Sequence, residues 1–215
     1  LIVSPGVNQQ TPAIRKAVAS GVHVTGDVDM FARQVQAPMI AITGSNAKST
    51  VTSLVGEMAR AEGLNVAVAG NIGLPVLDLL QETPANLYVL ELSSFQLETT
   101  TNLGAEVATV LNLSLDHMDR YASMEAYRNA KQRIFQKCRQ AVINADDSMS
   151  RADLPSTIRQ WHFSLAENSA SEFSVLTRDN KQYLGFNSDI LMPVSELKIA
   201  GSHNVANALA ALALG

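Results

Sequence analysis

The fold class of this 215-residue chain is decided by the stretch Pro38-Met39-Ile40-Ala41-Ile42-Thr43-Gly44-Ser45-Asn46-Ala47-Lys48-Ser49-Thr50. Its first five residues form an apolar run, and a polar loop follows from Thr43 to Lys48. Beyond the loop, apolar residues recur at helical spacing on one face until about Gly63: Val51, Leu54, Val55 and Met58. This order predicts a buried strand, a tight loop and an amphipathic helix.

The same alternation of strand and helix continues along the chain. Four further apolar runs have the length of strands: Asn65–Ala69, Leu87–Leu92, Ala108–Leu113 and Ala141–Asn144. A segment with helical periodicity, Met124–Lys137, separates the last two. Alternating strands and helices predict an α/β fold with a mostly parallel, P-loop-type sheet flanked by helices.

The pattern changes after Asp147. Three short segments are separated by polar turns, and they predict a small antiparallel sheet that flanks the main one toward the C-terminus: Trp161–Ser164, Glu172–Leu176 and Gln182–Phe186. A last helical pattern runs from Asn204 to Leu214.

Both ends of the chain read as cuts through a longer sequence. The chain opens without Met on the apolar residues Leu1–Val3, which run into the turn Ser4-Pro5-Gly6, and it closes inside a helical pattern. A helix is predicted near Thr11–Ser20. We expect residues 1–34 to be the end of a preceding α/β domain and residues 35–215 to be the main domain.

The composition is that of a globular protein, with 47% hydrophobic and 17% charged residues and a net charge of −4. A mildly acidic balance argues against a general surface for nucleic acid or anionic membrane, although it leaves room for a local phosphate site. The single cysteine, Cys138, cannot form an internal disulfide, which fits a reducing cytoplasm. We therefore expect a cytoplasmic monomer with neither nucleic acid nor membrane as a partner.

The polar loop Thr43–Thr50 lies where a strand hands over to a helix, and phosphate binding needs that geometry. Free backbone N–H groups and the helix dipole both point at an anion there. Lys48 would reach the β- and γ-phosphates of a nucleotide, and Ser49 or Thr50 would hold Mg²⁺. The strict P-loop motif is not met, because position 42 is Ile and position 47 is Ala. The alternative is a polar turn with a solvent-facing lysine.

Acidic and imidazole groups follow two other predicted strands. Glu91 ends the apolar run Leu87–Leu90, at the sheet edge where α/β proteins bind ligands, and it is placed to hold Mg²⁺. His117 follows the strand Ala108–Leu113 and is a candidate metal or substrate contact. The alternatives are that Glu91 caps a helix and that the histidine lies in a capped turn, with Asp119 and Arg120 paired to each other.

Lys131 falls on the apolar face of its predicted helix, four residues after Tyr127 and three before Ile134. Such a lysine usually extends its ammonium group to water. The alternative is a functional lysine, because partial burial lowers the pKa and exposes an amine that can react with carbon dioxide. The resulting carbamate would be negatively charged and would help to bind Mg²⁺.

With these residues in place, the sequence resembles the Mur ligases. The phosphate loop, Asn71 within Gly70–Gly73, Glu91, His117 and Lys131 all match the pattern of that family's central domain. The segment Glu91-Leu92-Ser93-Ser94-Phe95-Gln96-Leu97-Glu98 looks like the D-glutamate-adding branch in particular. By this resemblance, residues 1–34 would be the end of the UDP-binding N-terminal domain, and residues 35–215 most of the ATP-binding central domain. The family's C-terminal amino-acid-binding domain would be absent.

The resemblance implies an ATP-dependent amide ligase that joins D-glutamate to a UDP-linked muramoyl-alanine precursor, using ATP, two Mg²⁺ ions and a carbamylated Lys131. It implies these ATP contacts: Gly44, Ser45, Asn46, Ala47, Lys48, Ser49, Thr50, Asn204 and Asn207. It implies these metal contacts: Ser49, Thr50, Glu91, His117 and Lys131. It implies these contacts to the UDP-linked precursor: Ser4, Gly6, Asn71 and His117. The catalytic set is Lys48, Glu91, His117 and Lys131.

One departure from the family pattern lies in the loop itself, where the family commonly has Gly and this chain has Ala47. A side chain there disfavours unusual backbone dihedral angles, but we expect the change to be tolerated because Lys48, Ser49 and Thr50 are intact. Three other functions remain open on the sequence alone: another Mur or folylpolyglutamate ligase, a P-loop phosphotransferase, and a non-catalytic nucleotide-binding module. A phosphotransferase would have no need of Lys131, and a non-catalytic module would bind nucleotide without metal-dependent turnover.

Overall fold

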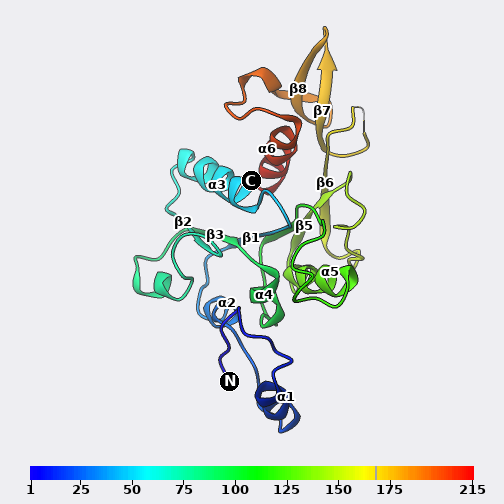
Figure 1. The fold of residues 1–215 in the computed structure, drawn as a ribbon. Helices are drawn as coiled ribbons and strands as arrows, with labels where there is room; N and C mark the ends of the chain where they lie inside the picture. Colours follow the sequence, from blue (N-terminus) through cyan, green and yellow to red (C-terminus); the bar gives the residue numbers. More distant parts are fainter. Residues whose placement is uncertain (168) are drawn as a thin grey trace.

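The computed structural model describes residues 1–167 and 169–215, and within these residues nine strands form one sheet in the order β2-β3-β1-β4-β5-β6-β7-β8-β9 (Figure 1). The strands are β1 (Met39–Thr43), β2 (Val66–Gly70), β3 (Leu87–Glu91), β4 (Val107–Val110), β5 (Gln140–Asn144), β6 (Arg159–Ser164), β7 (Phe173–Arg178), β8 (Lys181–Phe186) and β9 (Asp189–Pro193). The strands from β2 to β7 in this order are parallel, which confirms the predicted α/β fold.

The register of the central strands brings their carboxyl ends to one edge of the sheet. Ile42 of β1 lies opposite Glu91 of β3 on one side and Thr109 of β4 on the other. Gly70, the last residue of β2, also lies opposite Glu91. The loops that follow these four strands therefore meet, as in other open α/β sheets that bind ligands at this edge.

Helices cover both faces of the sheet (Figure 1). On one face lie α3 (Lys48–Ala61) and α6 (Ser202–Leu214), and on the other lie α2 (Asp27–Ala32), α4 (Ser94–Glu98) and α5 (Met124–Gln132). Each face has its own hydrophobic core, because each strand of a doubly covered sheet buries side chains in both directions.

Two predicted boundaries differ from the structure. The predicted helix Met124–Lys137 ends earlier: α5 stops at Gln132, and the 3₁₀ turn η2 (Arg133–Phe135) follows. This tighter turn directs Ile134 and Phe135 into the core, and Lys137 in the left-handed region then reverses the chain. The predicted strand Ala108–Leu113 also ends early, at Val110, because the residues beyond it bond to the phosphate loop instead.

The antiparallel pairing predicted for Glu172–Leu176 and Gln182–Phe186 is confirmed by β7 and β8, and β9, which the sequence did not predict, pairs antiparallel with β8. They continue the main sheet and do not form a separate one. Trp161–Ser164, predicted as part of the antiparallel group, lies in β6 and pairs parallel with both β5 and β7. The edge of β5 that β4 leaves free hydrogen-bonds to β6, and this pairing buries Phe163.

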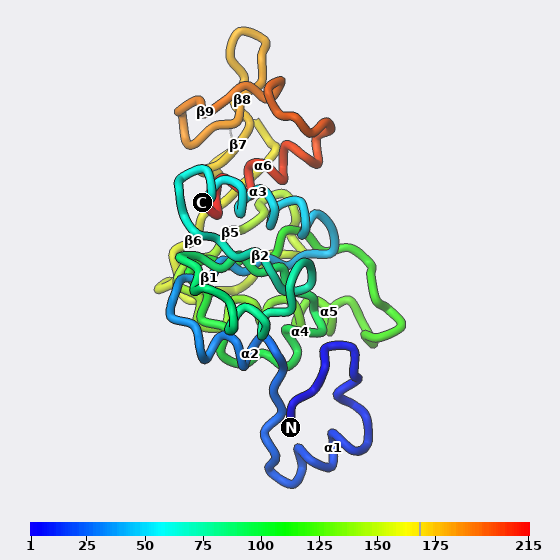
Figure 2. Tube along the Cα trace, turned by 90° about the vertical axis from the view of Figure 1, so that its left-hand side faces the viewer, coloured from blue at the N-terminus to red at the C-terminus, as the bar shows by residue number. Residues whose placement is uncertain are grey.

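Residues 1–25 form a small unit at one end of the molecule, opposite the end that carries β8 and β9 (Figure 2). It contains α1 (Pro12–Ala19), which confirms the predicted helix, and a short parallel bridge between Ile2 and Thr25. The short 3₁₀ turns η1 (Asp78–Gln81) and η3 (Val194–Glu196) complete the secondary structure of the described residues.

The connection from this unit to the sheet is fixed by a buried carboxylate in α2. Asp29 accepts hydrogen bonds from the backbone N–H groups of Thr101 (2.7 Å) and Asn102 (3.0 Å) and from the Thr25 hydroxyl (2.9 Å). Burial alone would raise the pKa of Asp29, but these hydrogen bonds outweigh it and lower the pKa to about 2. The carboxylate thus ties three segments of the chain together.

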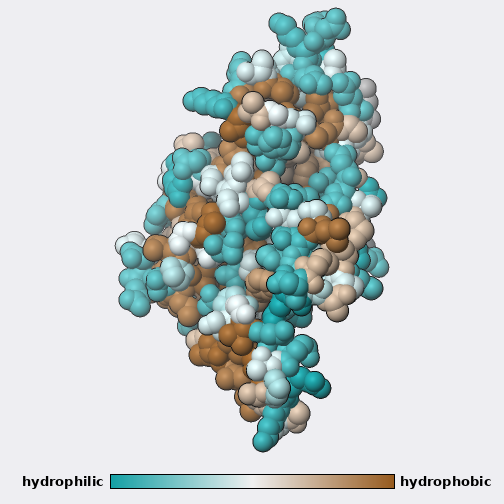
Figure 3. All heavy atoms as spheres, viewed as in Figure 1, coloured by the Kyte–Doolittle hydropathy of each residue, from teal (hydrophilic) through white to brown (hydrophobic). Residues whose placement is uncertain are grey.

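The surface is a mosaic of hydrophilic and hydrophobic residues on the face that Figure 3 shows. In residues 1–167 and 169–215, no helix has the length and hydropathy needed to cross a membrane.

Candidate active site

The phosphate loop occupies the turn between β1 and α3, so the first turn of a 14-residue helix points its free N–H groups at the loop. Lys48 is the first residue of that helix. Its ammonium group donates to the carbonyl oxygens of Gly44 (3.0 Å) and Ser45 (3.1 Å), and the side chain is half-buried. The alternative of a solvent-facing lysine is therefore wrong: the cation is held across the loop, where an anion would bind.

Ala47 adopts the left-handed conformation, with φ 65° and ψ 0°. The Ala47 side chain therefore does not exclude unusual dihedral angles from the loop. The left-handed region costs a residue with a Cβ atom about 1 kcal/mol. The Ala47 methyl group packs against the core between α3 and the sheet, which offsets part of that cost.

The loop is braced by residues just beyond β4 that the sequence did not single out. Asn112 accepts a hydrogen bond from the Asn46 N–H (2.8 Å) and donates its amide to the Asn46 carbonyl (3.2 Å). The Ser114 N–H donates to the Ser45 hydroxyl (3.0 Å). The available signal was a lone polar residue, Asn112, inside the apolar run from Leu111 to Leu113.

Glu91 lies next to the loop, at the end of β3, and only 1% of it is exposed. Its two carboxylate oxygens accept hydrogen bonds from the Ser49 hydroxyl (2.8 Å) and from the Asn71 amide (2.7 Å). The neighbouring helix α4 has its own cap, Ser93, in a capping box with Gln96. The alternative that Glu91 serves as a helix cap is therefore wrong, and three predicted site residues converge in one cluster.

Gly70 makes this convergence possible. Its φ is 109°, and a Cβ atom at this position would lie 2.2 Å from the Glu91 carbonyl oxygen. The close approach lets the Asn71 N–H donate to that carbonyl (2.7 Å) while the Asn71 side chain reaches the carboxylate. Only glycine fits between the two strand ends.

Lys131 is buried, with 2% exposure, so the alternative that its ammonium reaches water is wrong. The ammonium group donates to the Gly44 carbonyl (2.9 Å) and the Thr43 hydroxyl (3.3 Å), and it lies 4.8 Å from the centre of the Tyr127 ring. Burial and, next, the nearby Lys48 charge lower the pKa of Lys131 to about 7. A large fraction of this side chain is thus a neutral amine at neutral pH.

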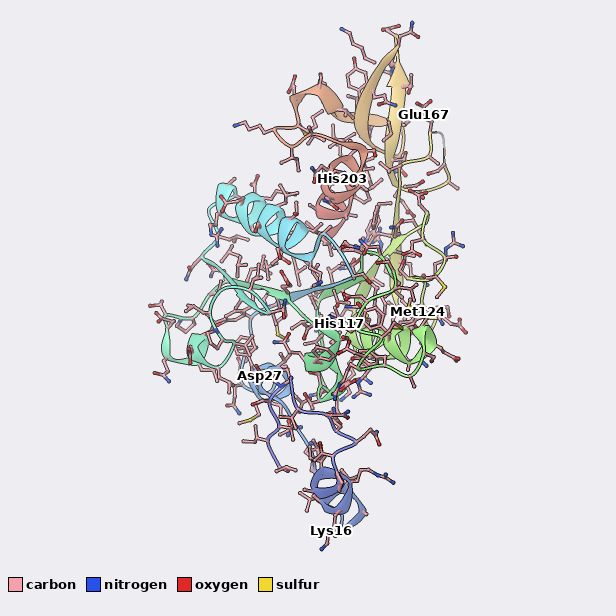
Figure 4. The ribbon with its side chains drawn as sticks, in the orientation of Figure 1. Lys16, Asp27, His117, Met124, Glu167 and His203 are labelled. Carbon is pink, nitrogen blue, oxygen red and sulfur yellow. The ribbon has the colours of Figure 1, made fainter. Side chains whose placement is uncertain are left out.

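His117 lies between the sheet and the start of α5, which Met124 marks in Figure 4. It is a positive-φ residue (53°), its side chain is 44% exposed, and Nε2 lies 3.4 Å from an Asp116 carboxylate oxygen. Its ring packs 5.0 Å from Phe95. The predicted pairing of Asp119 with Arg120 is wrong, because the Arg120 guanidinium pairs with Glu98 at 2.8 Å.

A metal ion at this site would need ligands beyond unmodified acids and imidazoles. Within the described part of the chain, no three His, Cys, Asp or Glu side chains come close enough together to hold one. The residues nevertheless fit a hard cation such as Mg²⁺: the Glu91 carboxylate and the Ser49 hydroxyl supply oxygen ligands, and Thr50 lies in the same first turn of α3.

The remaining predicted residues lie away from this cluster. Asn204 and Asn207 are on α6, where the Asn207 amide donates to the Asn204 side chain (3.0 Å), which in turn donates to the Ala200 carbonyl (2.7 Å). Ser4 and Gly6 belong to an exposed turn closed by the hydrogen bond from the Val7 N–H to the Ser4 carbonyl (3.0 Å). Their predicted contacts to adenine and to the nucleotide-sugar stay predictions.

Comparison with known proteins shows to which family the chain that carries this loop, acid and buried lysine belongs. Residues 42–215 match the Mur ligase middle domain, and the chain belongs to the Mur ligase family. It is 57% identical to the UDP-N-acetylmuramoylalanine--D-glutamate ligase of Pseudomonas savastanoi pv. phaseolicola and 56% identical to the enzyme of that name from Pseudomonas aeruginosa. Both alignments cover 100% of this chain and 48% of the relative. The chain thus spans about half the length of these curated relatives.

A solved structure of a UDP-N-acetylmuramoyl-L-alanyl-D-glutamate--2,6-diaminopimelate ligase matches with a TM-score of 0.71 at 25% identity. The match covers 98% of this chain and 55% of that chain.

Proposed function

We propose that this chain is the ATP-binding part of a ligase that adds D-glutamate to UDP-N-acetylmuramoyl-L-alanine. The observation that carries the proposal is the convergence of Ser49, Asn71 and Glu91 beside a phosphate loop that also holds the buried Lys131. The names of relatives more than 50% identical over the whole chain support the same activity. Residues 1–34 are then the end of a UDP-binding domain, and residues 35–215 belong to the ATP-binding domain.

The chemistry begins from a carboxylate, which is a poor electrophile. Transfer of the ATP γ-phosphoryl group to an oxygen of the alanyl carboxylate gives ADP and an acyl phosphate. The amine of D-glutamate attacks the acyl carbon, and inorganic phosphate leaves from the tetrahedral intermediate as the amide forms. A proton is released from the attacking amine. Positioning and charge stabilisation carry such a phosphoryl transfer, and both are tasks for the residues of this site.

Lys48 is the side chain best placed to stabilise charge on the transferring phosphoryl group. In the structure its ammonium bonds to two loop carbonyls, and phosphate oxygens would take over those bonds. The N-terminus of α3 adds its N–H groups and dipole. We assign ATP contacts to the loop from Gly44 to Thr50 and, near the adenine, to Asn204 and Asn207.

Magnesium ions bound to ATP would neutralise charge on the phosphates when they occupy the site. We assign their ligands to Ser49, Thr50, Glu91 and His117, with a carbamate on Lys131 as a further ligand. Carbamylation of Lys131 joins its neutral amine to carbon dioxide with loss of a proton. It replaces a cation near Lys48 with an anion, and the carbamate nitrogen keeps one N–H for the Gly44 carbonyl.

The precursor would lie between the His117 turn and the N-terminal unit. We assign the alanyl end to Asn71 and His117, and the nucleotide-sugar end to Ser4 and Gly6. The protein would act as a cytoplasmic monomer, with two Mg²⁺ ions and no nucleic-acid or membrane partner.

The test is ADP release by the full-length protein. We expect release over many turnovers to require both UDP-N-acetylmuramoyl-L-alanine and D-glutamate, and to fail when a folate replaces the precursor or L-glutamate replaces D-glutamate. Release with folate would identify a folylpolyglutamate-type ligase. Sustained release with the phosphoryl acceptor alone, well beyond one ADP per protein and without an amine, would identify a phosphotransferase.

A further inference from the structure

Arg120 links the N-terminal unit to the turn that carries His117. Its guanidinium donates to the Val7 carbonyl (3.3 Å) and to the Glu98 carboxylate (2.8 Å). Among the hydrogen bonds of the described residues, the contact with Val7 is the one that joins residues 1–24 directly to residues 35–215. Arg120 thus adds a direct tie between the turn at Val7 and the His117 turn, beside the connection that Asp29 fixes between Thr25 and Thr101.

Val7 and Arg120, the two partners of this hydrogen bond, are each bonded to a residue that is predicted to contact substrate. The Val7 N–H bonds to the Ser4 carbonyl (3.0 Å), so holding Val7 also holds the Ser4–Gly6 turn. The Arg120 N–H bonds to the His117 carbonyl (2.9 Å), and the same bond helps to keep His117 in its left-handed conformation. A bonded path therefore runs from the Ser4 turn through Arg120 to His117.

The residues around Arg120 and Glu98 stabilise the ion pair between them. The loop 8–10 relies on that ion pair for its position. The side chains of Arg120 and Glu98 are 13% and 20% exposed, so solvent screens them only partly. The guanidinium lies 5.4 Å from the centre of the Phe95 ring, which itself packs against His117. By contrast, Asn8 and Gln10 are exposed, and the loop 8–10 borders an open cavity of about 580 Å³ that Arg120 and Glu98 also line.

We propose that Arg120 is a positioning residue for the nucleotide-linked substrate: it holds the Ser4–Gly6 turn in register with His117, so that one substrate can contact both. This inference rests on the proposed function. Losing the contact should weaken binding of the substrate that spans the two turns. It should leave ATP, which binds at the phosphate loop, and the chemical step nearly unchanged.

The experiment uses full-length protein with Arg120→Ala, and with Arg139→Ala as the matched control. Arg139 pairs with Glu106 at 3.5 Å on an exposed part of the surface. For Arg120→Ala we expect KM for UDP-N-acetylmuramoyl-L-alanine to rise about tenfold, as for loss of one charge-assisted hydrogen bond. Its Kd, measured calorimetrically without ATP, should rise by the same factor. We expect kcat and KM for ATP to stay within about twofold of wild type.

A second variant and a second measurement keep the proposal testable. Glu98→Gln keeps the packing but weakens the ion pair, and it should raise the same KM about threefold. Hydrogen–deuterium exchange of the Val7 and Thr11 amides should be faster in Arg120→Ala than in wild type. That readout needs no substrate, so it stands even if the wild-type protein does not ligate D-glutamate. Unchanged exchange, or a fall in kcat with unchanged KM, overturns the proposal.

Discussion

At the scale of single residues, the site is defined by two lysines that approach one loop. Lys48 donates to the Gly44 and Ser45 carbonyls, and Lys131, which extends from α5, donates to the same Gly44 carbonyl. Two cations this close repel each other, and burial prevents water from screening them. Burial and, next, the Lys48 charge lower the pKa of Lys131 to about 7, so the two side chains need not both be charged, and a carbamate would place an anion beside Lys48.

A carbamylated Lys131 and a lysine with a purely structural role predict different effects of substitution. In the full-length enzyme, Lys131→Ala should nearly abolish ADP release, and added short carboxylic acids should restore part of it by supplying oxygen ligands with the same charge. Lys131→Arg should stay inactive, because a guanidinium remains cationic and forms no carbamate. Near-normal turnover by Lys131→Arg would remove the carbamate from the mechanism.

Ala47 gives a second prediction at this scale. Replacing an ordinary helical alanine by glycine costs about 1 kcal/mol, as expected for Ala59 of α3, which packs against the same core. Ala47 is left-handed, so Ala47→Gly relieves strain of similar size and should leave the free energy of unfolding almost unchanged. Urea unfolding of the two variants checks this. Equal losses for Ala47→Gly and Ala59→Gly would show that Ala47 is unstrained.

At the scale of elements, the helix α3 and its loop form one unit, which we propose as the site for the ATP phosphates. The helix supplies free N–H groups, and Asn112 and Ser114 fix the loop from the β4 side. The loop is thus held in place before any nucleotide arrives, and such preorganised groups lose little on binding.

Lys48→Ala tests this unit. Removing the ammonium deletes a contact that strengthens as charge develops on the transferring phosphoryl group. We expect kcat for ADP release by the full-length enzyme to fall about 10²-fold or more. The loop should keep its shape, because the Asn46–Asn112 hydrogen bonds do not involve Lys48. An unchanged kcat would rule out the loop as the phosphate site.

At the scale of the whole molecule, the predictable features were those that short stretches of sequence specify. The strand, loop and helix around Lys48 and the acid at the end of β3 follow from local patterns, and the structure places them as predicted. The bracing by Asn112 was missed because it joins residues 66 apart in sequence. The continuation of β7–β9 from the main sheet was missed for a similar reason: pairing partners are not visible in one strand's sequence.

The placement of the N-terminal unit leads to the last prediction, which concerns Asp29. This carboxylate is fully buried, and its pKa of about 2 lies below the ordinary value of 3.8. A lowered pKa contributes stability that is present above pH 3.8 and is lost as the pH falls through 2. The shift corresponds to about 2 kcal/mol at pH 7. Asp29→Asn should therefore lower the free energy of unfolding by roughly that amount at pH 7.

The difference between Asp29→Asn and wild type should narrow as the pH falls from 4 to 2, since the wild-type carboxylate becomes protonated there. Urea unfolding of this chain at several pH values measures it. Asp27→Asn is the control, because Asp27 lies in the same helical turn and accepts one backbone bond, from Val28. If the difference in the free energy of unfolding between wild type and Asp29→Asn stays constant from pH 7 to pH 2, the charge of Asp29 does not hold the N-terminal unit to the sheet.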